Sequence, residues 1–258
     1  MKKHLVVTSL MWLTALALLI PARAEAQSPT VKQLLARVAA LEATVAALQA
    51  KLACVSVDDS PINGLAGPNF IFEGCNVHVR SGSGSTDDGG ALTGLGNLVV
   101  GYNEPRSSRG GFDLTGRTGS HNLIVGHSHK YPSFGGFVAG NRNTVSGPES
   151  SVSGGGSNTA SGHFSSVSGG ESNTASGGTS SVSGGMNNTA SGGQASSVSG
   201  GLSNTASGNF SSVSGGGSDF FMVGGNVASG DLSSVSGGNN RSATGQFDWA
   251  AGTLFETE

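Results

Sequence analysis

An apolar residue that is followed two positions later by Gly recurs through the second part of the chain. Successive members from Ile124 to Val213 lie 14, 14, 15, 15, 16 and 15 residues apart, so the unit has about 15 residues. A fixed period is typical of repeat proteins, whereas a flexible linker needs no register. The members are Val99, Ile124, Val138, Val152, Val167, Val182, Val198, Val213, Met222, Val235 and Ala250.

Each regular unit contains two short arms, SSVSG and NTASG. Alternation in the first arm puts Val on one face of a strand and the flanking Ser on the other. In the second arm, Ala and Asn share one face, and Thr and Ser take the opposite face. Gly pairs and Ser-Gly steps supply the turns. We therefore expect a mainly β chain, a β-solenoid whose coils of two strands stack ~4.8 Å apart.

One Asn and one Val recur in each coil, and both are assigned structural roles. Stacked Asn side chains can form hydrogen bonds along a column, so the pattern predicts a turn ladder rather than a binding site. The predicted core positions are Val138, Val152, Val167, Val182, Val198, Val213 and Val235. The predicted ladder is Asn143, Asn158, Asn173, Asn188 and Asn204.

A different period, of seven residues, occupies 31–52. Apolar residues at 3-4 spacing form the a and d positions of three heptads, which predicts a short coiled coil. The alternative is a single amphipathic helix packed on a globular domain. Arg37 at a g position and Glu42 at an e position resemble a known trimer-favouring pattern. The seam residues are Val31, Leu34, Val38, Leu41, Val45, Leu48 and Leu52.

The repeat is poor in apolar bulk, and this supports the same oligomeric state. One Val and one Ala per coil gain ~2–3 kcal/mol on burial. Ordering the backbone of a coil costs roughly 15 kcal/mol or more. We therefore expect three copies to share an axis, so that each Val, such as Val152, finds apolar neighbours on other chains.

The first residues have the pattern of a secretory signal peptide. Lys2 and Lys3 precede a 16-residue apolar run, Leu5 to Ile20, and small residues suited to cleavage follow at Ala24 and Ala26. The alternative is a retained membrane anchor. No later apolar run is long enough to cross a bilayer as a helix. The predicted organisation is a signal peptide at 1–26, a coiled coil at 27–53, a β-rich connector at 54–97 and a repeat head with its cap at 98–258.

Export makes disulfide formation possible, and the chain has two cysteines, Cys54 and Cys75. We expect them to pair, the alternatives being two free thiols or bridges between chains. Bulky residues gather near the end of the repeats and are expected to close the last coil. These cap residues are Phe247, Trp249, Leu254 and Phe255.

The repeat motif resembles that of a known family. NLIVG at 122–126, GFVAG at 136–140 and six copies of SSVSGG are similar to the repeats in YadA-like heads of trimeric autotransporter adhesins. The resemblance covers Leu98 to about Gly252. It implies a left-handed β-roll of 14–15-residue repeats, a homotrimer and an adhesin on the bacterial cell surface or outside the cell. Its partners would be extracellular matrix, a cell surface or a glycan. Here the coiled coil precedes the head, and no C-terminal β-barrel anchor is expected.

Charge argues against nucleic acid as a partner. The formal net charge is -3, only 11% of residues are charged, and no Lys or Arg lies between Asn143 and Asn240. Binding to a phosphate backbone depends on such cations. Inserted polar residues at 103–120 are expected to form an exposed loop that contacts partners.

Candidate chemistry is sparse. His121, His127 and His129 are weak metal candidates, and the last two would share a face of an extended strand. The alternative, exposed polar histidines, is preferred because no acidic or Cys residue adjoins them. Asp87-Asp88-Gly89-Gly90 is expected to form a turn rather than a Ca²⁺ site. No GxSxG, P-loop or HExxH motif is present, so we expect no enzyme activity and no cofactor.

These features favour an exported, adhesin-like trimer that serves as a structural, surface-binding protein. An ice-binding β-solenoid is an alternative, although the rungs read Thr-Ala-Ser rather than Thr-x-Thr. A fibre or spike protein acting on glycans is another, although no pair of carboxylates is visible in the repeats.

Overall fold

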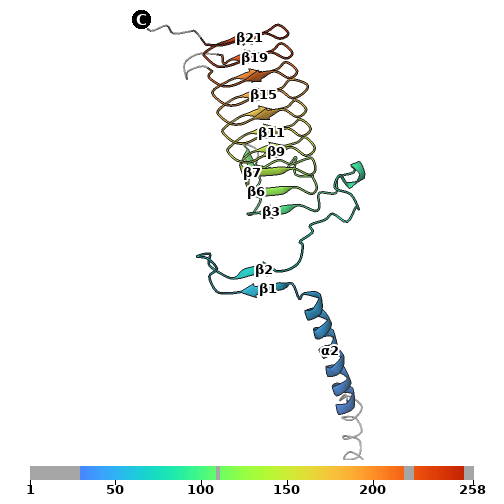
Figure 1. Cartoon of the computed structure of the whole chain (residues 1–258). Coiled ribbons are helices and arrows are strands. Elements are labelled where there is room, and N and C mark those ends of the chain that lie inside the picture. The colour runs from blue at the N-terminus through green and yellow to red at the C-terminus, as the bar shows by residue number, and fades with distance from the viewer. Residues whose placement is uncertain (1–29, 109–110, 218–223, 253–258) are drawn as a thin grey trace, which may run out of the picture. The chain divides into compact units, whose positions relative to one another are not determined.

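The computed structural model describes residues 30–108, 111–217 and 224–252 (Figure 1). The predicted signal peptide at 1–26 lies outside these residues, as does Met222 of the apolar series. The chain divides into two compact units, one up to Val77 and one from His78 onward, and each is described by itself.

The first unit begins with helix α2 (Val31–Lys51), which lies where the heptads predict a helix. A capping box starts it. The Thr30 Oγ1 accepts the Gln33 N–H at 3.3 Å, and the Gln33 Oε1 accepts the Thr30 N–H at 3.0 Å. None of the helix residues is buried. The apolar seam is therefore open along its length, with Leu41 63% exposed.

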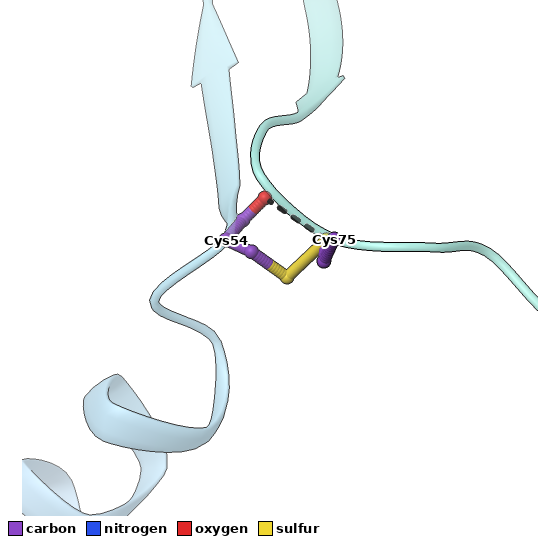
Figure 2. The surroundings of a disulfide bond; sticks show 2 residues. All are labelled: Cys54 and Cys75. Carbon is purple, nitrogen blue, oxygen red and sulfur yellow. Dashed lines mark hydrogen bonds between the residues drawn. A yellow bond between two sulfur atoms is a disulfide. The ribbon is translucent and has the colours of Figure 1, made fainter.

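A small antiparallel hairpin and a disulfide follow the helix. Strands β1 (Val55–Asp58) and β2 (Asn69–Phe72) pair with Val55 opposite Phe72. A disulfide joins Cys54, just before β1, to Cys75, just after β2, with the Cα atoms 6.0 Å apart (Figure 2). The disulfide closes the hairpin at its open end. The Glu73 N–H also donates to the Cys54 carbonyl at this end.

The second unit is a β-solenoid, as the two-arm repeat predicts. The strands of its coils belong to two parallel sheets, and the chain passes from one sheet to the other along the stack (Figure 1). The ten-stranded sheet contains β3 (Leu98–Val100), β6 (Leu123–His127), β7 (Phe137–Asn141), β9 (Ser151–Val152), β11 (Ser166–Val167), β13 (Ser181–Val182), β15 (Ser197–Val198), β17 (Ser212–Val213), β19 (Ser234–Val235) and β21 (Trp249–Ala250). The seven-stranded sheet contains β8 (Thr144–Val145), β10 (Thr159–Ala160), β12 (Thr174–Ala175), β14 (Thr189–Ala190), β16 (Thr205–Ala206), β18 (Val227–Ala228) and β20 (Ser242–Ala243).

Equivalent residues of successive coils stack in register. Val167 pairs with Val152 below it and Val182 above it, and Thr174 pairs with Thr159 and Thr189 in the same way. Each SV arm therefore adds a strand to one sheet and each TA arm adds a strand to the other. Identical side chains form columns along the solenoid.

The core lies between the two sheets and is complete within one chain. Val from the ten-stranded sheet faces Ala from the other sheet, and the Val and Ala side chains of the repeats are 0–1% exposed. The expectation that each Val needs apolar neighbours from other chains is wrong. A narrow interior explains this, because one small and one medium side chain fill it.

Glycine makes this narrow interior possible at one of the turns. A Cβ on Gly177 would lie 1.7 Å from the carbonyl oxygen of Gly192, and one on Gly162 would lie 2.0 Å from that of Gly177. No other residue fits where backbone stacks this closely on backbone.

The Asn column runs through the interior at the opposite turn. The Asn173 N–H donates to the Asn158 Oδ1 at 2.9 Å, and the Asn188 N–H donates to the Asn173 Oδ1 at 2.9 Å. The Asn173 Nδ2 donates to the carbonyls of Gly169 and Gly185, both at 2.9 Å. Each Asn thus links two coils through side-chain-to-backbone hydrogen bonds, and the side chains are fully buried.

A second polar column, of Ser, was not assigned a role from the sequence. The first Ser of each SSVSG arm is buried. The hydroxyls of Ser150, Ser165 and Ser211 donate to the carbonyls of Gly147, Gly162 and Gly208 at 2.7–2.8 Å. These bonds satisfy turn carbonyls that water cannot reach.

The predicted apolar cap is not buried in the described part of the chain. The side chain of Trp249 is 68% exposed, and that of Phe247 is 69% exposed. Trp249 pairs with Ser234 in the outward-facing column, which places the indole on the outer surface, where Nε1 donates to the Ser236 Oγ at 2.7 Å. Leu254 and Phe255, the other predicted cap residues, lie outside the described residues.

We predict that Asn173→Leu destabilises the solenoid by about 2 kcal/mol or more, because the buried Asn188 N–H and the Gly169 carbonyl lose their partners. Urea unfolding followed by circular dichroism measures the change. Asn239→Leu is the matched control, since the same substitution at an exposed turn should shift stability by less than about 0.5 kcal/mol. Equal effects of the two substitutions would contradict a stabilising ladder.

Candidate functional site

The polar insertion at 103–120 is a hairpin attached to the solenoid rather than a free loop. Its strands β4 (Arg106–Ser108) and β5 (Gly111–Asp113) are antiparallel. The Arg106 guanidinium donates to the Ser128 carbonyl at 2.8 Å, to the Asn143 carbonyl at 3.0 Å and to the Thr144 Oγ1 at 2.8 Å. One arginine therefore bridges two successive coils, which holds the insertion in a fixed place.

Two further contacts hold the same insertion. The Arg117 guanidinium donates to the His129 carbonyl at 3.2 Å and to the Asn103 carbonyl at 2.6 Å. Lys130 Nζ lies 2.7 Å from Asp113 Oδ2, and this contact lowers the pKa of Asp113. The hairpin still exposes Phe112. It is thus an ordered, outward-facing feature on the first coils.

The three candidate histidines do not form a metal site among the described residues. His127 is exposed at the end of β6, whereas His129 is fully buried. They do not share a face, because Ser128 between them has a φ of 62° and interrupts the alternation of an extended strand. The expectation that all three are exposed is wrong for His129, which is fully buried, and for His121, whose side chain is only 14% exposed.

His129 is the first member of the column that Asn residues continue. Its Nδ1 accepts the Asn143 N–H at 3.2 Å, and its Nε2 donates to the Val125 carbonyl at 3.1 Å. Burial lowers the pKa of His129. The neutral imidazole therefore accepts the backbone N–H of the next coil, as the side-chain amide oxygen of Asn does in later coils.

His121 and Asp88 lie near the start of the second unit and are held by protein groups. His121 Nε2 accepts the Ser81 N–H at 3.0 Å, and Nδ1 donates to the Thr86 carbonyl at 2.8 Å. Asp88 accepts hydrogen bonds from the Ser81 hydroxyl at 2.5 Å and from the Thr93 N–H at 2.8 Å. Asp88 begins the short 3-10 helix η1 (Asp88–Gly90), which is the predicted turn.

The flat outer faces of the solenoid carry hydroxyl groups in columns. On the seven-stranded sheet, the Thr residues of β8, β10, β12, β14 and β16 are paired in register, and Ser two positions later, such as Ser161, is exposed. On the ten-stranded sheet, Ser residues on both sides of each Val face outward, as Ser151 and Ser153 do. Both faces are uncharged and suit hydrogen bonding.

One edge of the solenoid carries exposed apolar side chains, which the sequence analysis missed. They occupy the same turn position in different coils, with a left-handed backbone whose φ is 57° at Phe164, 54° at Phe210, 57° at Leu232 and 64° at Phe247. For a bulky residue, the left-handed conformation is less favourable in free energy by about 1–2 kcal/mol. The side chains are 49–69% exposed. The available sequence signal was a polar–apolar pair just before SSVSG, as in His163-Phe164 and Asn209-Phe210.

Two adjoining hollows lie along this edge, and together we call them the turn groove. The first has a volume of about 460 Å³ and is lined by Gly193, Gln194, Asn209, Phe210, Asp231, Leu232 and Gln246. The second has a volume of about 320 Å³ and is lined by His163, Gly178, Thr179, Gly193, Gln194, Ala195 and Phe210. The hollows share the stretch around Phe210, so the turn groove follows the stacking direction.

The fold and surfaces define a parallel β-solenoid with hydroxyl-bearing faces and a grooved edge. No protein-family model matches the chain, and no curated protein matches it. Among the residues that the structure describes, no helix is both long enough and apolar enough to span a bilayer.

We predict that His129 makes the solenoid less stable as the pH falls. The unfolded chain takes up a proton near pH 6.5, whereas burial resists protonation in the fold. The contribution of neutral His129 to the free energy of unfolding is therefore complete above about pH 6.5 and declines below it. Urea midpoints at pH 7.5 and pH 5.5 measure the loss.

His129→Asn is the matched variant, because Asn occupies the same column in the next coil and keeps the acceptor for the Asn143 N–H. It should lose less stability than the natural chain over this pH interval. The same loss in both proteins would rule out His129 as its source.

Proposed function

We propose that the chain is an exported, homotrimeric, adhesin-like protein that serves a structural, surface-binding role and carries out no catalysis. The observation that carries this proposal is the open apolar seam of helix α2. Val38, Leu41 and Val45 are 49–63% exposed on a helix with no buried residue. A heptad seam of this kind gains stability only by packing on other helices.

The residues that flank the seam favour a coiled coil of three helices over one of two. Arg37 and Glu42 flank the seam at g and e positions, from which they can pair between neighbouring helices. Their spacing resembles a trimer-favouring pattern, and the repeats resemble those of YadA-like heads. We therefore propose left-handed solenoids of 14–15-residue repeats, grouped in threes behind a short coiled coil.

The surfaces of the solenoid support binding rather than chemistry. In-register columns such as Thr159 and Thr174, with exposed Ser beside them, present hydroxyls over both faces. No Lys or Arg lies between Asn143 and Asn240, so these faces suit neutral partners better than polyanions. Extracellular matrix, a cell surface or a glycan would be contacted here or through the hairpin that ends near Asp113.

Export is supported by two independent features. The first 26 residues have the pattern of a secretory signal, and a disulfide joins Cys54 to Cys75. Such bonds persist in oxidising compartments and are rare in the cytosol. We therefore place the mature chain outside the cell or on a bacterial cell surface.

Ice binding is a second candidate, because the Thr column of the seven-stranded sheet is in register from Thr144 to Thr205. A regular array of hydroxyl and methyl groups could match a crystal surface. Thermal hysteresis and inhibition of ice recrystallisation measure this activity, and the absence of both would exclude it.

We predict that the natural chain has three times its monomer mass in light scattering. Leu41→Lys should give monomers, because it puts a charge in the seam. Ala43→Lys adds the same charge outside the seam and should leave the trimer intact. Circular dichroism should show the solenoid folded in both variants, since α2 contributes nothing buried to the core. A monomeric natural chain would refute the proposed trimer.

A further inference from the structure

We propose that the turn groove binds a linear, uncharged glycan. This inference rests on the surface-binding part of the proposed function and names the ligand class. It does not depend on the trimer.

The apolar part of the turn groove suits a sugar ring. Phe210 borders both hollows and is 52% exposed, and Leu232 extends the apolar surface on the next coil. His163 and Phe164 have ring centroids 3.7 Å apart where the second hollow ends. An aromatic face packs well against the C–H face of a sugar, which is the least hydrated part of a glycan.

The polar part supplies hydrogen-bonding groups that are already positioned. The Asn209 Oδ1 accepts the Gln194 N–H at 3.2 Å, and the Asp231 Oδ1 accepts the Asn209 N–H at 2.8 Å. These bonds orient both side chains. Among the described residues, the Asn209 Nδ2, the Asp231 Oδ2 and the amide of Gln246 have no partner, and they can bond to sugar hydroxyls as donors and acceptors.

The length and charge of the turn groove select among ligands. The turn runs over six coils from His163 to Gln246, about 24 Å at the spacing of β-strands. Small residues at Gly178 and Ala195 keep the space between the aromatic side chains open. No Lys or Arg lines the turn groove, so a polyanion lacks counter-charges.

Native gel electrophoresis of the full chain tests the proposal, with dextran, hydroxyethyl cellulose, mannan or soluble β-1,3-glucan cast in the gel and heparin as the anionic probe. Phe210→Gly removes the ring at a left-handed position that Gly adopts freely, so folding is preserved. Gln194→Ala removes an amide from the turn groove. Tyr102→Ala is the control, since Tyr102 is an aromatic residue that is 94% exposed and lines neither hollow.

At least one neutral polymer should retard the natural chain, and heparin should not. Phe210→Gly should weaken binding by about tenfold. Gln194→Ala should weaken it less, and Tyr102→Ala should leave it unchanged. Retardation by none of the four neutral polymers, or retardation that Phe210→Gly does not reduce, would overturn the proposal.

Light scattering of the same samples separates this inference from the proposed trimer. A trimer that binds no glycan overturns the inference alone, and a monomer that binds glycan overturns the trimer alone. A loss of mass in Phe210→Gly would assign the turn groove to contacts between copies and so overturn glycan binding.

Discussion

The narrow gap between the two sheets is the constraint on which the rest of the solenoid depends. Val and Ala fill it, and at the turns backbone stacks on backbone with Gly between. Buried Asn side chains along the column, and the buried hydroxyls of Ser150, Ser165 and Ser211, satisfy backbone groups at the turns. The high content of Gly, Ser and Asn therefore follows from geometry. It is the composition of a closely stacked coil rather than of a flexible chain.

Some of this architecture could be predicted from the sequence, because strict spacing and alternation determine strands and their inward faces. Val152, Ala160 and Asn158 were placed correctly in this way. Counting apolar residues led to the wrong conclusion that one chain could not bury its core, because the interior is so narrow that one Val and one Ala per coil fill it. His129 was misplaced because a single left-handed residue, Ser128, breaks the alternation. The turn groove was missed because its residues vary from coil to coil.

A core that is complete within one chain changes how association is understood. The buried groups of the solenoid need nothing from another copy. The trimer that we propose would therefore form through groups that are exposed in the single chain, of which the α2 seam is the clearest. Folding of the solenoid is therefore independent of the proposed trimer, since the core consists of residues of one chain. Each coil depends mainly on the coils next to it, as in other repeat proteins.

The left-handed turn column has a further consequence. Glu149, Phe164, Thr179, Ala195 and Phe210 adopt nearly the same backbone conformation, although their side chains differ in size and polarity. These side chains point away from the core, so an exchange at one of these positions leaves the strand register and the buried columns as they are. The constant interior can thus support a changing edge. Selection could alter what the protein recognises one coil at a time, while the scaffold that presents the edge stays the same.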